Sequence, residues 1–258
     1  LTAHNLHGQL PATFFNLSQL EFLYLSDNVI HGPLPEIVNL PALSLFNLSY
    51  NSLTGLIPDS IGKMHSLNLL YLSNNRLSGP IPPCFTKLAH LQYLYLLNND
   101  LSGPLPAAFG NLTELLFFNL GSNRVSGEVP ASFIGLKKLQ LLYLNNNSFS
   151  GPFPRGLPAS LTKMSLECNH MSGEIPDCVW SLPNLTSLHL SGNAFTGPLV
   201  NSVGSSSSSG ISDGFSISPS LIDVSLSHNR LSGSIPSMIL THPFQNLDLS
   251  YNRLTGSI

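Results

Sequence analysis

The sequence predicts a single repeat solenoid of the α/β class, in which each repeat adds one strand to a parallel sheet. Two observations predict it. An asparagine recurs at intervals of 22 to 24 residues, with one longer gap of 36, and a glycine lies four residues after every such position. A proline lies seven residues after it in nine of the ten repeats that reach that far. A fixed period of this length is typical of stacked repeats.

We call the recurring asparagine the ladder residue. It defines about eleven repeats, and histidine takes its place in the first: His4, Asn28, Asn51, Asn75, Asn99, Asn123, Asn147, Asn169, Asn193, Asn229 and Asn252. Because the period runs throughout, and a solenoid grows without starting a second core, we expect residues 1–258 to form one domain. The sequence begins and stops inside a repeat, without polar caps. We therefore expect the domain to be truncated at both ends.

The chemistry of one repeat explains its fixed residues. Leu67, Leu70 and Leu72 alternate with outward residues, as a short strand with one buried side requires. The amide of Asn75 has two donors and an acceptor, so we expect it to bond the backbone of its own turn and of the next repeat. Gly79 permits close approach between coils. No repeat can bury its apolar side alone, so stability requires stacking.

Two repeats depart from the period. The interval between Asn147 and Asn169 is two residues short, which predicts a tighter turn at residues 156–160. The interval between Asn193 and Asn229 carries about twelve extra residues, including five consecutive serines. Residues 200–220 are therefore predicted to be a flexible inserted loop, rich in serine and glycine. A tolerated surface insertion explains it better than a ligand-contacting loop.

The composition argues against several classes of function. Only 9% of residues are charged and the net charge is -3, so no basic stripe for nucleic acid or anionic membrane is present. No apolar run reaches the roughly 18 residues of a spanning helix. The histidines are scattered without metal-ligand spacing, and no phosphate loop or nucleophile elbow occurs. We expect no enzyme activity, cofactor or metal, and three unpaired thiols at Cys84, Cys168 and Cys178.

Acceptor sequons for N-linked glycans point to the secretory pathway. A chain rich in asparagine and serine also produces such triplets by accident. The first candidates are those on the return path, Asn16, Asn111 and Asn184, since a glycan projects freely there. The other two fall in or beside a strand, at Asn47 and Asn146.

The run LSNNRLSGPIPPCFTKLAHLQYLYLLNNDLSGPLPAAFGNL resembles the plant-specific subclass of extracellular leucine-rich repeats. The resemblance covers essentially the whole chain. It implies a leucine-rich-repeat solenoid: a right-handed superhelix with a concave parallel sheet, a second short strand near the Leu-Ser-Gly segment, and 3-10 turns on the convex side. It also implies an extracellular glycoprotein of signalling or defence. Receptor kinases, receptor-like proteins and polygalacturonase-inhibiting proteins share the pattern.

Outward strand positions carry no folding constraint, so they are the candidate ligand contacts. Six and four residues before the ladder residue, the first six strands present apolar and tyrosine side chains except at Asn47 and Asn119, and the last four present polar ones. Tyrosine gives large contact area at little entropy cost. Lateral stabilisation of the sheet by the same rings is the alternative explanation. The predicted ligand-binding residues are Phe22, Tyr24, Leu45, Leu69, Tyr71, Tyr93, Tyr95, Phe117, Tyr143 and Lys163.

The sequence therefore favours an extracellular recognition module that binds a peptide or protein on its concave face, and in which a co-receptor could join. The alternative is a secreted inhibitor of a microbial cell-wall hydrolase such as polygalacturonase. An ice-binding surface ranks last, because it requires a regular array of small polar residues. The column two before the ladder begins with Ser26, Ser49 and Ser73 but is broken by Leu97 and Glu167, among others.

Overall fold

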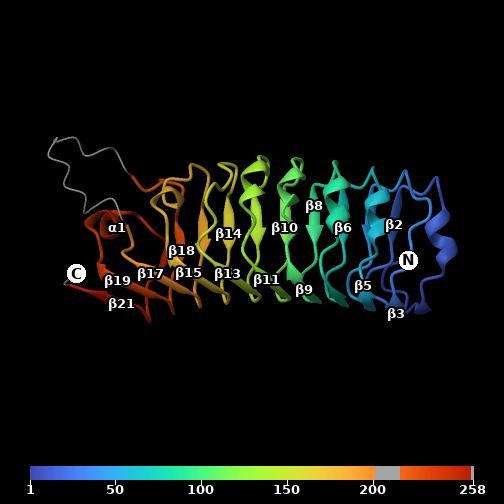
Figure 1. The fold of residues 1–258 in the computed structure, drawn as a ribbon, viewed down its shortest axis with the longest axis horizontal. Coiled ribbons are helices and arrows are strands. Elements are labelled where there is room, and N and C mark those ends of the chain that lie inside the picture. The colour runs from blue at the N-terminus through green and yellow to red at the C-terminus, as the bar shows by residue number, and fades with distance from the viewer. Residues whose placement is uncertain (201–215, 257–258) are drawn as a thin grey trace.

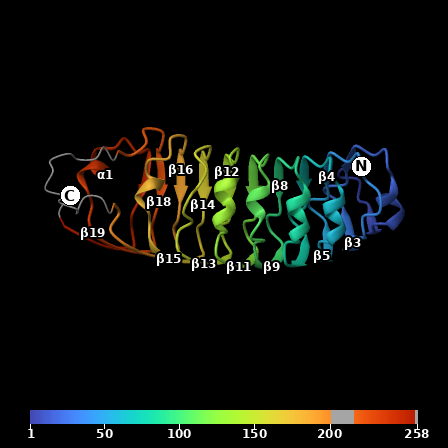
Figure 2. The same cartoon turned by 45° about the horizontal axis from the view of Figure 1, so that its top comes forward.

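The computed structural model describes residues 1–200 and 216–256, which wind into coils stacked side by side along one long axis (Figure 1). Two parallel sheets run along the stack, one of ten strands and one of eleven, and in each the strands follow sequence order. The two sheets occupy different sides of the coil (Figure 2). The predicted leucine-rich-repeat solenoid, with one strand per repeat in a parallel sheet, is confirmed.

The even-numbered strands form the ten-stranded sheet: β2 Phe22–Tyr24, β4 Leu45–Asn47, β6 Leu69–Tyr71, β8 Tyr93–Tyr95, β10 Phe117–Asn119, β12 Leu141–Tyr143, β14 Lys163–Ser165, β16 Ser187–His189, β18 Asp223–Ser225 and β20 Asn246–Asp248. The odd-numbered strands form the second sheet, near the Leu-Ser-Gly segments: β1 His7–Gln9, β3 Val29–Pro33, β5 Ser52–Leu56, β7 Arg76–Gly79, β9 Asp100–Pro104, β11 Arg124–Gly127, β13 Ser148–Gly151, β15 His170–Glu174, β17 Ala194–Gly197, β19 Arg230–Ser234 and β21 Arg253–Thr255.

Short helical turns occupy the return path of most repeats. In the part of the chain that the structure describes, six are 3-10 helices: η1 Ala12–Asn16, η2 Asp59–Lys63, η3 Pro83–Lys87, η4 Phe109–Asn111, η5 Ala131–Gly135 and η6 Asp177–Val179. One is the α-helix α1 Ser237–Thr241. The return segments after β3 and β13 contain no helix, and the second of these is the shortened repeat at 156–160. The predicted 3-10 turns are therefore present in most repeats but not in all.

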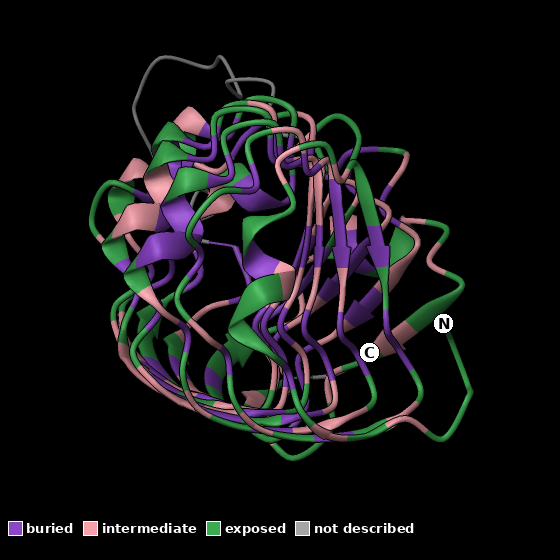
Figure 3. Cartoon of the chain, turned by 90° about the vertical axis from the view of Figure 1, so that its right-hand side faces the viewer, coloured by how far each residue is buried: buried purple, intermediate pink, exposed green. Residues whose placement is uncertain are grey.

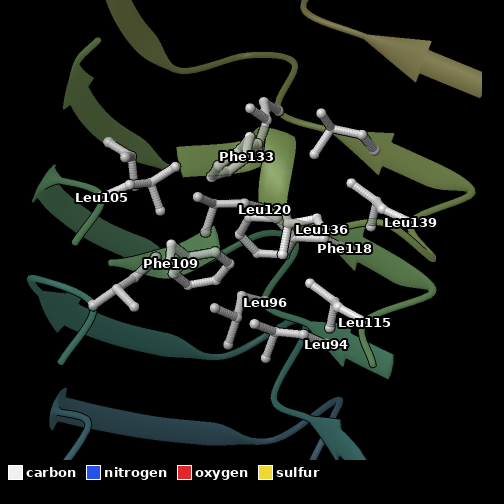
Figure 4. Close-up of a cluster of buried hydrophobic side chains, with 14 of the residues drawn as sticks. Leu94, Leu96, Leu105, Phe109, Leu115, Phe118, Leu120, Phe133, Leu136 and Leu139 are labelled. Atoms are coloured by element: carbon white, nitrogen blue, oxygen red, sulfur yellow. The ribbon is translucent and has the colours of Figure 1, made fainter. Parts of the chain in front are cut away.

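The core lies inside the coils, between the ten-stranded sheet and the return path (Figure 3). Leu67, Leu70 and Leu72 are fully buried, as predicted. Large aromatic residues fill the middle, and the ring of Phe109 from η4 stacks on Phe118 of β10 at 4.9 Å (Figure 4). Phe109 also stacks on Phe133 in the next repeat at 5.8 Å. The core is thus continuous from one repeat to the next.

The ladder asparagines hold adjacent coils together through their amides. Asn75 accepts a hydrogen bond from the backbone N–H of Leu53 at 3.0 Å and donates to the carbonyl of Leu48 at 3.0 Å. It also donates to Leu72 within its own turn. Leu48 and Leu53 belong to the preceding repeat, so the prediction of bonds to the next repeat had the direction wrong. Each asparagine reaches back and satisfies backbone groups that no apolar residue could satisfy.

The residue before each ladder position adopts the left-handed conformation, with φ between 51° and 68°. Asparagine and glycine tolerate this conformation, but Tyr50 and Cys168 also adopt it. The asparagine bonds described above and the parallel pairing on both sides keep the backbone in this turn. The sequence did not reveal this feature because the residue type at the position varies.

Most of the predicted inserted loop lies outside the described residues. At its edges, Val200 and Ile217 are buried, and the backbone N–H of Ser218 donates to the carbonyl of Trp180 at 2.8 Å.

Cys84, Cys168 and Cys178 are free thiols. Across residues 1–200 and 216–256, none of the helices has the length and apolar character needed to traverse a lipid bilayer.

Candidate ligand-binding face

The outward side chains of the ten-stranded sheet form one continuous surface, which we call the sheet face. It consists of the first and third residues of each even-numbered strand, whereas in β6 and its neighbours the middle residue is buried. The register is in step with the repeat, because Leu69 pairs with Tyr93 and Tyr71 pairs with Tyr95. Side chains one repeat apart therefore lie directly beside each other. This face corresponds to the one predicted to be concave.

Four aromatic rings form a ladder across the sheet face, from β6 to β12. Tyr71 stacks on Tyr95 at 4.6 Å, and Tyr95 stacks on Phe117 at 4.3 Å. Phe117 contacts Tyr143 in a tilted arrangement at 5.8 Å. Burial raises the pKa of the Tyr71, Tyr95 and Tyr143 hydroxyls above the ordinary tyrosine value. These hydroxyls are therefore neutral and able to donate at physiological pH.

The ten predicted contact residues differ in their exposure. Phe22 and Tyr24 are exposed, as is Lys163 on the polar half. Six are half-buried on the face, namely Leu69, Tyr71, Tyr93, Tyr95, Phe117 and Tyr143. Leu45 is buried, at 9% exposure, so it offers little surface to a partner. The ring stacking also provides the lateral stabilisation that the sequence left as an alternative.

A shallow hollow lies on the sheet face beside the aromatic ladder, with a volume of about 340 Å³. Tyr71 and Tyr95 line it together with three asparagines, Asn47, Asn74 and Asn119. Ser73, two residues before its ladder asparagine, also lines it. The hollow therefore combines tyrosine rings with polar groups, a combination suited to binding an amphipathic ligand.

A polar cluster occupies the other half of the sheet face, over β16 and β18. The Ser187 hydroxyl donates to Asp223 Oδ2 at 2.8 Å, and His189 Nε2 lies 2.8 Å from the same oxygen. Burial raises the pKa of Asp223, but the hydrogen bonds from Ser187 and His189 and the nearby imidazole outweigh it and lower that pKa below its usual value. Ser187 Oγ also lies 3.1 Å from His189 Nε2, but that nitrogen carries the hydrogen that it donates to the Asp223 carboxylate, so it is not free to act as a base toward Ser187.

Sequence reasoning found the histidines scattered, without metal-ligand spacing, and missed this cluster. The residues are 34 to 36 positions apart, across the longest interval in the chain. A signal was nevertheless available, because Ser187 and Asp223 each lie six residues before a ladder asparagine and the sheet pairs them directly. Within residues 1–200 and 216–256, no group of three or more histidine, cysteine or acidic side chains is placed to hold a metal ion.

The five sequons fall in different environments. The exposed ones are Asn16, Asn111, Asn146 and Asn184. The amide of Asn184 donates to the carbonyl of Ala159 at 2.8 Å. Asn47 is half-buried on the sheet face, and its Oδ1 accepts the backbone N–H of Ser49 at 3.0 Å. A glycan at Asn47 would therefore project from the face predicted to bind ligand, whereas the three return-path positions face solvent.

Comparison with known proteins agrees with this architecture. Family profiles described as leucine-rich repeats match residues 36–77 and 89–149, and again residues 184–206 and 220–241. The chain belongs to the leucine-rich-repeat family. The receptor-like protein CLAVATA2 of Arabidopsis thaliana is 39% identical over 61 residues, which is 24% of this chain and 8% of that protein. The resemblance to plant extracellular leucine-rich repeats is thereby confirmed.

Solved structures of plant leucine-rich-repeat proteins superimpose along almost the whole chain. The Arabidopsis receptor kinase HAESA ectodomain, in complex with an N-terminally extended IDA peptide hormone, matches with a TM-score of 0.77 and 33% identity, over 98% of this chain and 46% of that one. A plant ice-binding protein matches with a TM-score of 0.68 and 28% identity, over 97% of this chain and 70% of that one. This chain therefore spans less than half the length of the receptor ectodomain.

Proposed function

We propose that this leucine-rich-repeat chain is the recognition part of an extracellular plant receptor-like protein, and that it binds a peptide or protein on its sheet face. The observation that carries the proposal is the ladder of half-exposed aromatic rings beside the hollow. The structural similarity to a receptor ectodomain in complex with a peptide hormone supports a ligand of this class.

The physical case rests on how the aromatic side chains are displayed. Aromatic rings at outward strand positions add nothing to the interior of the coil, so the apolar surface that they leave exposed is available to a partner. Stacking fixes the rings before a ligand arrives, which reduces the entropy lost on binding. The neutral hydroxyls of Tyr71, Tyr95 and Tyr143 add hydrogen-bonding capacity. The polar cluster at Asp223 gives the other half of the face a different chemistry.

The same proposal places glycans and further partners elsewhere on the molecule. N-linked sugars at Asn16, Asn111 and Asn184 would leave the sheet face free, since these residues lie on the return path. A co-receptor would contact the bound ligand together with a flank of the solenoid. The similarity to receptor kinases, such as HAESA, lies within the repeats.

The test is a binding comparison with a display library of random twelve-residue peptides. Peptides enriched on the wild-type chain are measured against a variant with Tyr71, Tyr95 and Tyr143 changed to alanine. Removal of three contact rings should weaken binding at least tenfold. A matched variant changes Val38, Leu56 and Ile134 to alanine, all exposed and outside the ten-stranded sheet. If both variants bind like wild type while their circular dichroism is unchanged, the sheet face is not the binding surface.

Ice binding is a second candidate, because a plant ice-binding protein shares the fold over 70% of its length. The serine column that would have to be regular is interrupted at Leu97, Gly121 and Glu167. We therefore expect no thermal hysteresis from this chain. A measurable gap between its melting and freezing points would favour ice binding over the receptor proposal.

A further inference from the structure

Ser73 lines the hollow beside the aromatic ladder and has a buried hydroxyl without a hydrogen-bond partner. Ser73 is 6% exposed, and its Oγ makes no hydrogen bond to the protein. A buried hydroxyl in this state destabilises the free protein. Ser227 occupies the equivalent position six repeats on and is also 6% exposed, but its Oγ donates to Ser191 Oγ at 3.0 Å. Ser227 thus shows that a hydroxyl at this repeat position can be satisfied within the protein.

Two amides lie on either side of the stacked tyrosines in the sheet register. Asn47 Oδ1 accepts the N–H of Ser49, and Asn119 Oδ1 accepts the N–H of Gly121, each at 3.0 Å. The acceptor atoms are therefore used in local turns, and within the described residues neither Nδ2 group donates to the protein. The sheet register runs from Asn47 through Tyr71 and Tyr95 to Asn119. At three strand spacings, the amides are about 14 Å apart.

We propose that the hydroxyl of Ser73, turned toward the hollow by rotation about its Cα–Cβ bond, and the amides of Asn47 and Asn119 form a donor subsite that binds backbone carbonyl oxygens of an extended peptide. The proposal rests on the peptide-binding function above and assigns atoms to it. An extended chain rises about 3.3 Å per residue, so the two amides span about four residues of ligand. Tyr71 and Tyr95 stack on each other, so they present their edges and hydroxyls to the ligand, not their faces.

The charge of the hollow indicates whether the ligand group that binds there is a neutral carbonyl or a carboxylate. None of the residues that line it is basic, and Asp27 contributes a negative charge. A ligand carboxylate would lose its hydration without gaining an opposite charge, which is costly. A peptide carbonyl needs only the donors that the hollow supplies. The subsite therefore recognises the ligand main chain, and sequence preference must come from neighbouring positions on the face.

The subsite also has a consequence for glycosylation. A glycan on Asn47 is attached at Nδ2, the atom that donates to the ligand in this proposal. Asn47 must therefore remain unmodified in the functional protein, although it lies in an acceptor sequon. Peptide mapping by mass spectrometry of the chain secreted from plant cells reads this directly, and a glycan found at Asn47 would overturn the proposal.

The binding test uses the chain with a peptide enriched on it from the random twelve-residue library. Ser73→Ala should weaken binding about 3- to 10-fold, the range expected for one lost hydrogen bond, while leaving the melting temperature unchanged or raising it. The matched control Ser227→Ala should lower the melting temperature and leave affinity unchanged. Asn119→Asp should also weaken binding, because it removes the donors but keeps the turn. An aspartate can support this type of turn, because Asp248, at the equivalent position of another repeat, accepts the N–H of Ser250 at 3.0 Å.

Replacing single ligand carbonyls by thioamides, which are weaker acceptors, then locates the contact. The wild-type chain should discriminate against a thioamide at one position, and Ser73→Ala should lose that discrimination. If wild type binds a peptide but Ser73→Ala and Asn119→Asp bind it equally well, the donor subsite is wrong and the broader function stands. If no peptide binds wild type, the peptide-binding function fails, and the subsite fails with it.

Discussion

Replacement of one ladder asparagine tests whether these amides hold the solenoid together. Asn99 lies in the middle of the stack and accepts the N–H of Leu77 at 3.0 Å. It donates to the carbonyls of Leu72 and Leu96, at 3.0 and 3.2 Å. Leucine has the same branching as asparagine, so Asn99→Leu removes these bonds without opening a large cavity.

The expected loss can be worked out from the remaining partners. The carbonyl of Leu72 still accepts from Asn75, and that of Leu96 still accepts from Asn123. The N–H of Leu77 has no second acceptor and lies in a buried residue, so it becomes unsatisfied. One orphaned buried N–H together with two weakened carbonyl bonds gives a loss of about 2–4 kcal/mol in the free energy of unfolding.

Urea denaturation followed by circular dichroism measures this loss from the shift in midpoint. The variant Asn99→Asp separates the acceptor from the donors, since it keeps an oxygen for Leu77 but directs a second oxygen at the carbonyls. We expect it to be destabilised at least as strongly as Asn99→Leu, because a carboxylate facing carbonyls is repelled and desolvated. If Asn99→Leu unfolds within about 0.5 kcal/mol of wild type, the ladder is not what holds adjacent coils together.

Three further predictions follow from close approach, charge and exposure. A Cβ at Gly110 would meet the backbone oxygen of Ser132 at 1.8 Å, so Gly110→Ala should lose about 2–3 kcal/mol in urea denaturation, and more than Gly121→Ala, whose nearest contact is a side chain at 3.0 Å. Because the pKa of Asp223 is lowered in the folded protein, its carboxylate stabilises the fold at pH values above the ordinary aspartate pKa of about 3.9. This stabilisation is lost as the pH falls through the folded-state pKa. Asp223→Asn should therefore have a free energy of unfolding about 1 kcal/mol lower than that of wild type at pH 5–7. If this difference does not shrink as the pH falls below about 4, the linkage is excluded. Secretion from plant cells should place a glycan on exposed Asn111, read as a mass shift that Asn111→Gln abolishes.

The architecture was predictable because each constraint repeats in the sequence at a fixed offset. Leu70 and Asn75 sit in environments that recur in every coil, so the period alone identifies an inward position and a bonded turn. The direction of the amide bonds was not predictable from the period, because an offset of one repeat forward or backward looks identical in the sequence. The replacement of a 3-10 turn by α1 at residues 237–241 depends on local packing, which the period does not encode.

The candidate site was only partly predictable, for a different physical reason. Tyr71 and Tyr95 could be placed side by side, because outward columns follow from the strand period. Their stacking geometry could not, since it depends on side-chain rotamers. The contact of His189 with Asp223 runs diagonally between two columns and crosses the longest interval. Reading columns one at a time hides such a pair, whereas comparing neighbouring columns would have found it.

The serine column shows how one repeated position can serve two purposes. At Ser227 the hydroxyl bonds a neighbouring serine, so the position contributes to the stability of the sheet. At Ser73 the next residue in the column is Leu97, which has no polar group to offer, and the hydroxyl is left without a partner. In a solenoid, where the core is made by repetition, we expect binding positions where an outward column loses its repetition.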